Sequence, residues 1–376
     1  MATSISINVR RIRKMRELTQ QQIADMAGIS RNAYRSIEAG TSLPRGNNLS
    51  AIARALRVSV FDLSEEIPPL RSIRFRALRA LSGRQKAERE YIFAEVAIWL
   101  RNFSELELML GERRPYVFAK GISSSDPRSA AVEARARLGM SSDHCIADIC
   151  GMLDEAGIKI CLLSSTLDAF FGLSVGPSDG GPAVAVNVNE SIPIERRIFT
   201  AAHELGHLLM HVASYDSDQA MENKEQESQA NQFASFFLMP DEGFRRMWSQ
   251  YRGLNFVHRV LWVKRIFRVS YKTVLVRLVE AGAADNGIFE RFSRSYASLY
   301  GKKLAFKEEP DAFVPPKYEP INLQSEDFVA GRFWRLVRDA LDGNLITLSR
   351  AAEISGISVS NMRGRVEDWG MTGDGT

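Results

Sequence analysis

The sequence has few cysteines that could form disulfides and lacks apolar runs long enough to span a membrane. The 376 residues include only three cysteines, Cys145, Cys150 and Cys161, which are odd in number and lack C-x-x-C spacing. We therefore expect reduced core thiols in a cytoplasmic protein rather than a disulfide framework. No run of about 18 apolar residues occurs, so no membrane-spanning helix is predicted. The first residues lead into arginines instead of an apolar signal region, and no secretion signal is expected.

An excess of acidic residues is also missing. The formal net charge is +4, and the basic excess lies at the front: residues 1–60 hold ten Lys or Arg and three Asp or Glu, a net of +7. A basic surface concentrated in one segment is typical of contact with DNA phosphates. The alternative is a solvated basic face on a helical domain that binds protein.

The most informative motif is H-E-x-x-H within residues 200–211, an apolar and helix-compatible stretch. Residues four apart lie on one face of a helix, so His203 and His207 would direct two imidazoles at one point, as a Zn²⁺ site requires. Glu204 beside them is placed to take the proton of an attacking water. The spacing predicts a zinc hydrolase, most often a peptidase. The alternative is a helix whose histidines merely fill polar positions.

A catalytic zinc needs a third protein ligand. His211 is one turn further on, but three histidines on successive turns would span about 12 Å along the axis. Zn–N bonds are only about 2 Å long, so we expect His211 to line the cleft or to cap the helix. Glu227 lies near the start of a second predicted helix that ends at Pro240, and it is our third ligand; Glu222 and Glu225 are the alternatives.

The segment H-E-L-G-H-L-L-M-H, followed by E-x-x-A-N-x-F-A and then L-M-P, resembles the ImmA/IrrE-type zinc metallo-endopeptidases of bacteria and their mobile elements. The resemblance covers roughly residues 145–285. It implies that His203, His207 and Glu227 hold Zn²⁺ and that Glu204 is the catalytic base. It also implies a single protein target, such as a repressor or an antitoxin, rather than bulk proteolysis.

The front of the chain predicts a helix-turn-helix. Thr19 can cap a helix over 20–27, Gly28 and Ile29 make the turn, and Ser30 can cap a second helix that runs to Ala39. Residues 1–63 resemble the phage-repressor/Cro-type (XRE) domains. That resemblance implies binding to double-stranded DNA as a homodimer on a palindrome, and a position on the bacterial nucleoid.

Position on the two helices predicts which side chains meet DNA. The first residues of a recognition helix reach base edges, where Arg pairs with guanine and Asn with adenine. Residues one turn on reach bases or phosphates, and those flanking the helices suit phosphates. The predicted contacts are Gln20, Arg31, Asn32, Arg35, Ser36 and Arg45. Tyr34 and Ile37 are expected in the core, and the resemblance also implies an ion pair between Arg13 and Glu38.

We expect a mainly α fold with a small α+β zinc-peptidase core and an all-α N-terminal helix-turn-helix domain. The expected domains are residues 1–65 (helix-turn-helix), 66–125 (linker and a long connecting or dimerisation helix over 83–110), 126–290 (zincin-like metallopeptidase) and 291–376 (C-terminal helices). Near the C-terminus, 348–354 and 359–366 resemble two helices about a glycine turn. Mixed charges and a turn short of caps favour a packing or docking pair over a second DNA-binding motif.

Within the peptidase segment a helix over 146–156 and strands over 158–163, 170–175 and 183–188 are predicted from apolar and β-branched runs. Such a sheet offers a way to bind an extended substrate by strand addition. We assign this role to residues 183–189, as a hypothesis.

Together these features predict a DNA-tethered zinc endopeptidase that regulates transcription by cleaving one regulatory protein, with His211 or Tyr215 as a donor to the oxyanion. The alternative is a transcription factor whose zincin-like domain senses a ligand or binds a partner with little or no turnover. An antitoxin-like role is a third hypothesis. Replacement of Glu204 by Gln separates turnover from binding.

Overall fold

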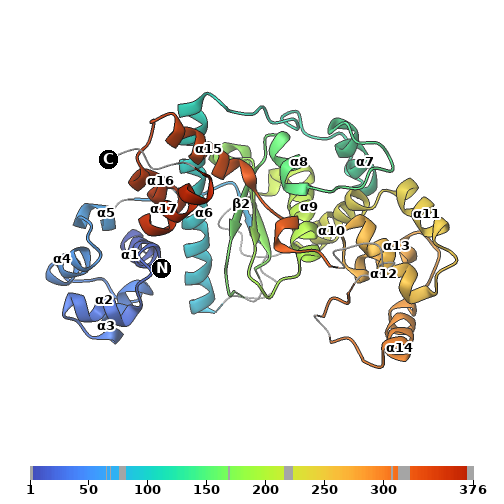
Figure 1. The fold of residues 1–376 in the computed structure, drawn as a ribbon, viewed down its shortest axis with the longest axis horizontal. Coiled ribbons are helices and arrows are strands. Elements are labelled where there is room, and N and C mark those ends of the chain that lie inside the picture. Colours follow the sequence, from blue (N-terminus) through green and yellow to red (C-terminus); the bar gives the residue numbers. More distant parts are fainter. Residues whose placement is uncertain are drawn as a thin grey trace. The chain divides into compact units, whose positions relative to one another are not determined.

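The computed structural model describes residues 3–64, 66–67, 69–75, 82–167, 170–215, 223–305, 308–311 and 322–370. It is mainly α-helical with one four-stranded sheet, as expected (Figure 1). Contacts divide the chain into two compact units. Unit 1 holds Met1–Arg71, Arg79–Arg113 and Gly331–Thr376; unit 2 holds Ser72–Leu78 and Arg114–Ala330. This division differs from the one expected along the sequence, because the C-terminal helices pack in the same unit as the front of the chain.

Five helices build the front of unit 1: α1 (Ser4–Met15), α2 (Gln20–Ala27), α3 (Arg31–Glu38), α4 (Gly46–Ala55) and α5 (Val60–Ser64). Thr19 and Ser30 cap α2 and α3 as predicted, and Gly28 ends α2 in the left-handed region at φ 66°. Tyr34 and Ile37 are buried in the shared core, which confirms that prediction. The helix-turn-helix is therefore specified locally, by two caps and one glycine.

The long helix α6 (Gly83–Leu110) packs against the C-terminal helices α15 (Gly331–Asp342) and α16 (Leu348–Ser355). Its last turns bury Phe103 and Leu106 against the apolar face of α15. Arg332 of α15 pairs with Glu107 at 2.7 Å, both side chains being about 5% exposed or less. This helix thus has a covered apolar face within its own chain.

The last two helices correct one expectation. The turn between α16 and α17 (Val359–Asp368) is fully capped: Thr347 and Ser358 cap the two helices, and Gly356 takes the left-handed conformation at φ 67°. The pair repeats the α2–α3 arrangement of threonine cap, eight-residue helix, glycine, isoleucine and serine cap. The statement that this turn is short of caps is wrong, since both caps are single hydroxyl side chains that the sequence does contain.

Unit 2 is built on the sheet, whose strands are β1 (Ile73–Phe75), β2 (Lys159–Leu163), β3 (Gly172–Val175) and β4 (Ala183–Asn187). Their order is β1-β3-β4-β2; β2 and β4 are parallel, and the other pairs are antiparallel. Strand addition to residues 183–189 is therefore wrong, because β4 is hydrogen-bonded on both sides and offers no free edge.

Helices complete unit 2: α7 (Pro127–Arg137), α8 (Ile149–Glu155), α9 (Ile194–Met210), α10 (Lys224–Leu238), α11 (Asp241–Gln250), α12 (Phe256–Phe267), α13 (Tyr271–Glu280) and α14 (Ile288–Tyr300). Helix α8 starts later than predicted because Asp148 caps it. Helices α9 and α10 lie side by side (Figure 1). A Cβ at Gly206 of α9 would come within 2.9 Å of Phe233, so glycine permits this close approach.

Among the described residues, none of the helices is both long and apolar enough to cross a bilayer. None of the three cysteines, all of which lie in the described part of the chain, forms a disulfide; Cys150 and Cys161 are buried and Cys145 is half-buried.

Candidate metal centre and nucleic-acid interface

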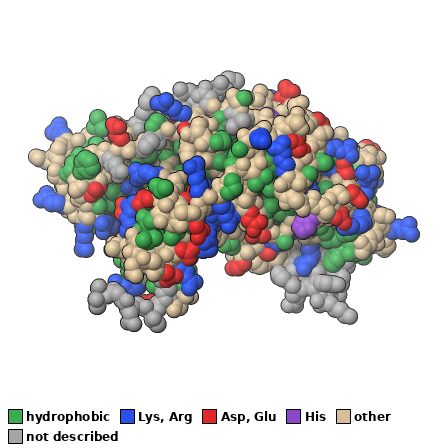
Figure 2. Space-filling view, turned by 90° about the horizontal axis from the view of Figure 1, so that it is seen from above, with side chains coloured by type: hydrophobic (Ala, Val, Ile, Leu, Met, Phe, Trp, Pro, Cys, Tyr) green, Lys and Arg blue, Asp and Glu red, His purple; other side chains and the backbone are tan. Residues whose placement is uncertain are grey.

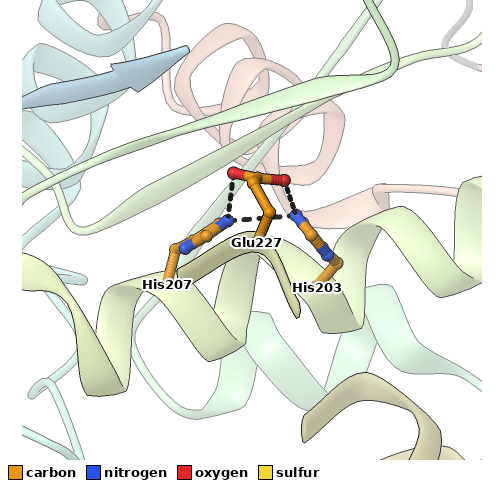
Figure 3. Close-up of side chains that lie close together, drawn as sticks. All are labelled: His203, His207 and Glu227. Carbon is orange, nitrogen blue, oxygen red and sulfur yellow. Dashed lines mark hydrogen bonds and ion pairs between the residues drawn. The ribbon is translucent and has the colours of Figure 1, made fainter. Parts of the chain in front are cut away.

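Helices α9 and α10 bring His203, His207 and Glu227 together (Figure 3). The two histidines lie one turn apart on α9, and Glu227 lies in the first turn of α10, where Asn223 caps the helix. All three side chains are about 5% exposed or less. The geometry therefore gathers two imidazoles and one carboxylate at a single buried point.

The distances fit a tetrahedral metal ion. Nε2 of His203 and Nε2 of His207 are 3.0 Å apart, and each lies 3.1–3.3 Å from an oxygen of Glu227. Ligand atoms bound to tetrahedral zinc at about 2.0–2.1 Å would lie about 3.3 Å from one another. Two imidazole nitrogens and a carboxylate oxygen, with the fourth position open, are the donor set of a catalytic zinc.

Hydrogen bonds behind the two rings fix the nitrogens that face Glu227. His203 Nδ1 lies 3.0 Å from Asn231 Oδ1, and His211 Nε2 lies 2.8 Å from Gln229 Oε1. Amide oxygens only accept, so these ring nitrogens carry the protons. The Nδ1 of His211 then accepts from Nδ1 of His207, 3.0 Å away. The Nε2 atoms of His203 and His207 therefore carry no protons. With the Glu227 carboxylate they form three electron-pair donors that converge at the point where a metal ion would bind.

Protonation at the site agrees with metal binding. Burial lowers the pKa of His207 to about 3. Burial alone would raise the pKa of Glu227, but its interactions with His203 and His207 outweigh the effect of burial and hold that pKa well below its usual range. Neutral imidazole and ionised carboxylate are the forms that ligate a metal.

Glu204 lies beside the cluster and is 3% exposed. Ser174 of β3 donates to its Oε2 at 2.7 Å, and Tyr215 donates in turn to Ser174 Oγ at 2.7 Å. Burial raises the pKa of Glu204. A carboxylate with a raised pKa and one oxygen fixed by a serine suits a group that accepts and returns a proton.

A pocket of about 10 Å³, room for about one water, opens against Glu204 and His203. Gly172 lies on its wall, and a Cβ there would come within 2.5 Å of Thr200 and 3.4 Å of Glu204. The absence of a side chain at this position lets β3 approach the helix that carries the catalytic candidates.

The structure places the remaining predicted site residues as follows. His211 is buried at the C-cap of α9, with both ring nitrogens in hydrogen bonds. Tyr215 gives its hydroxyl proton to Ser174. These contacts give both side chains a positioning role, and the oxyanion role of His211 or Tyr215 stays a prediction. Glu225 is exposed, and Glu222 lies outside the described residues.

Four participants were not assigned from the sequence. Asn231 belongs to the E-x-x-A-N motif and could have been found from its position there. Gln229, two residues after Glu227, and Ser174 carry no comparable signal. Arg74 bonds Gln226 at 2.6 Å and Glu227 at 3.3 Å, although it lies 153 residues before Glu227 in the sequence. Only the sheet topology reveals that contact.

The predicted DNA-contacting residues lie on α2 and α3, except Arg45, which is the N-cap residue of α4. Arg31, Asn32, Arg35 and Arg45 are exposed, whereas Ser36 and Gln20 are half-buried. Nε2 of Gln20 donates to Glu38 at 3.1 Å. The first turn of α3 thus presents an arginine and an asparagine to solvent, the two residue types that pair bidentately with purines.

An ion pair braces the same domain. Arg13 binds both oxygens of Glu38 at 2.8 Å, which confirms the pairing implied by the resemblance. On the face drawn in Figure 2, Lys and Arg side chains lie among Asp and Glu side chains. The basic excess of residues 1–60 is a property of their sequence.

Two segments match known protein families. Residues 154–279 match the IrrE N-terminal-like domain of the M78 peptidases, and residues 9–63 match the helix-turn-helix family. The expected combination of these architectures in one chain is confirmed. A comparison with curated proteins found no match. The chain thus joins a segment that matches the helix-turn-helix family to a segment that matches a peptidase family and holds a His-His-Glu cluster that could bind a metal.

Proposed function

We propose that this protein is a DNA-binding transcriptional regulator with zinc-dependent endopeptidase activity against one regulatory protein, such as a repressor or an antitoxin. The observation that carries the proposal is the convergence of His203, His207 and Glu227 beside Glu204, in a segment that matches a peptidase family. The helix-turn-helix at the front supports action at a promoter. We further propose that it acts in the bacterial cytoplasm, on the nucleoid, as a homodimer on double-stranded DNA.

His203, His207 and Glu227 would hold the zinc. When bound, zinc would polarise the scissile carbonyl and favour deprotonation of the attacking water. Glu204 accepts that proton and passes it to the leaving amine. Ser174 keeps one oxygen of Glu204 occupied, so the other is directed at the reacting groups. Asn231 and His211 hold the two histidine rings in the required orientation.

Metal content tests the ligand assignment. The purified protein is expected to bind about one zinc ion per chain. His203→Ala and Glu227→Ala should lose it, because two remaining ligands hold a metal weakly, whereas Glu225→Ala should retain it. Retention of zinc by the Glu227→Ala variant, measured by mass spectrometry of the metal, would place the third ligand elsewhere.

The competing function is a transcription factor whose zincin-like domain senses a ligand or binds a partner with little turnover. This alternative is supported by the fact that a preformed site indicates an ability to bind metal but does not establish a rate of peptide cleavage. Regulation of a target promoter by the Glu204→Gln variant separates the two functions. Loss of regulation, with zinc and DNA binding retained, supports the peptidase; unchanged regulation supports the sensor.

A further inference from the structure

The edge strand of the sheet nearest the candidate metal centre is β1, which comes from a segment far from the other strands in the sequence. Strand β3 would be the edge strand of unit 2 were it not paired with β1, which comes from the segment between the helix-turn-helix and α6. The pairing is antiparallel, with Ile73 opposite Val175, Arg74 opposite Ser174 and Phe75 opposite Leu173. A stretch of linker thus occupies the backbone donors and acceptors of β3.

The register places this linker across the catalytic candidates. Arg74 lies opposite Ser174, and Ser174 donates to Glu204 at 2.7 Å. An extended peptide that reaches Glu204 along the side of β3 facing away from β4 would need the same backbone hydrogen bonds that β1 now makes. Bound substrate and resident β1 therefore exclude each other.

Side chains hold β1 in this position. The Arg74 guanidinium donates to Gln226 at 2.6 Å and to Glu227 at 3.3 Å, and its side chain is only 12% exposed. Phe75 stacks on Phe170 with ring centroids 5.5 Å apart. Ser72 accepts a backbone hydrogen bond from Gly176 at 2.7 Å. The strand is anchored at both ends and, through Arg74, directly on the carboxylate of the metal cluster.

We propose that an extended segment of the substrate protein binds along the side of β3 that β1 now covers, and that β1 is a built-in competitor that blocks this binding. The inference rests on the proposed peptidase function, since it assigns the substrate's binding surface. A competitor on the same chain acts at an effective concentration in the millimolar range. Substrates of ordinary affinity are thus excluded until β1 leaves, and the chain protects its target from constant cleavage.

A labelled peptide tests the proposal without turnover. The probe is a fluorescein-labelled peptide with the sequence of residues 69–75, and the protein is the full-length, zinc-loaded chain in a Glu204→Gln background, which leaves the probe uncut. Arg74→Ala removes the charged anchor of β1, so the probe should bind about tenfold more tightly than in the parent. Lys120→Ala removes a positive charge from an exposed position elsewhere in the same unit and should leave binding unchanged.

A second variant locks β1 in place. Ile73 and Val175 face each other across the two strands, at a separation suited to a disulfide. In the double variant Ile73→Cys with Val175→Cys, the oxidised protein should bind the probe at least about tenfold more weakly than the reduced protein. The single variant Ile73→Cys controls for the thiol and should not respond to reduction.

Equal probe affinity in the parent, the Arg74→Ala variant and the oxidised double variant would overturn the proposal. Cleavage of the zinc-loaded wild-type chain within β1, seen by intact-mass analysis, would also overturn it, because β1 would then be a substrate. The test distinguishes failure of this inference from failure of the proposed function. If the probe binds as expected but no target is cleaved, only the proposed peptidase function is contradicted. If a target is cleaved but β1 does not compete with the probe, only the inference about β1 is contradicted.

Discussion

At the residue scale, the metal cluster depends on side chains that ligate nothing. The proximity of His203 and His207 could be predicted because H-E-x-x-H encodes it in a four-residue spacing on one helix. The supporting hydrogen bonds could not, since Gln229 meets His211 across two helices and Ser174 reaches Glu204 from a strand. Contacts of that kind depend on how the elements pack, and no local pattern records them.

His211 provides the sharpest test of this supporting layer. Its Nδ1 accepts from His207 and so fixes which nitrogen of the His207 ring faces Glu227. His211→Ala is expected to weaken zinc binding by about 10–100-fold, measured by competition with a chelating dye. His144→Ala, at an exposed histidine, should change nothing. Unaltered zinc affinity in His211→Ala would show that the ring needs no such partner.

The Arg13–Glu38 pair sets a pH dependence for the helix-turn-helix. Burial opposes ionisation of Glu38, but Arg13 more than compensates and lowers its pKa below the ordinary 4.5. A lowered folded pKa means that the pair stabilises the fold above about pH 4.5 and that this contribution is lost as the pH falls further. Glu38→Ala should therefore destabilise the domain by about 3 kcal/mol at pH 7.

Hydrogen exchange of the α1 and α3 amides measures this effect within the whole chain. The difference between wild type and Glu38→Ala should shrink as the pH falls below about 4.5. A difference of the same size at pH 3.5 would mean that packing of the glutamate side chain, and not its charge, supports the domain.

At the scale of elements, the helices with local start and stop signals were predictable and the sheet pairing was not. Bounds of α2 and α6 follow from Thr19, Gly28 and apolar periodicity. Residues 183–187 do form a strand, but its neighbours on both sides come from segments whose pairing no local pattern encodes. Strand existence is a local property, whereas edge position depends on long-range pairing.

The contact between α9 and α10 gives a prediction at this scale. Gly206→Ala places a methyl group 2.9 Å from the Phe233 ring. Overpacking costs about 1–3 kcal/mol, whereas the alanine gains about 1 kcal/mol of helix preference. We expect a net loss of about 1 kcal/mol and weaker zinc binding, because α10 carries Glu227.

Helix α17 offers the matched control. A Cβ at Gly364 meets nothing within 4 Å, so Gly364→Ala should stabilise the protein by up to about 1 kcal/mol. Both variants can be compared by urea denaturation and zinc titration. If Gly206→Ala stabilises the protein as Gly364→Ala does, the close approach of the two helices is not required.

At the scale of the whole molecule, DNA binding and the metal site belong to different units. Residues 9–63 lie in unit 1, and all metal-site residues lie in unit 2. The chain leaves unit 1 only for residues 72–78 before it returns to form α6. That short excursion supplies β1, so a segment between the helix-turn-helix and α6 is itself part of the sheet of unit 2.

DNA binding should be salt-dependent and confined to unit 1. With an operator recovered by selection in vitro, Arg45→Ala is expected to reduce the salt slope of binding by about 1, as loss of one phosphate contact does. Arg31→Ala should cost about 1–3 kcal/mol and relax specificity at one base pair. Arg294→Ala, at a 74% exposed side chain of α14, is the control, and fluorescence anisotropy at several salt concentrations is the measurement. Equal effects of all three variants would contradict the assignment.

Cleavage of a captured target tests the central claim most directly. The Glu204→Gln variant should retain zinc and trap its protein target from the cell of origin, because the binding surface and the metal ligands are intact. The wild-type protein, loaded with zinc, should then cut that captured protein at one site, a chelator should abolish the cut, and the variant should leave the protein whole. Cleavage by Glu204→Gln at the wild-type rate, or no cleavage by the zinc-loaded wild type, would contradict the account.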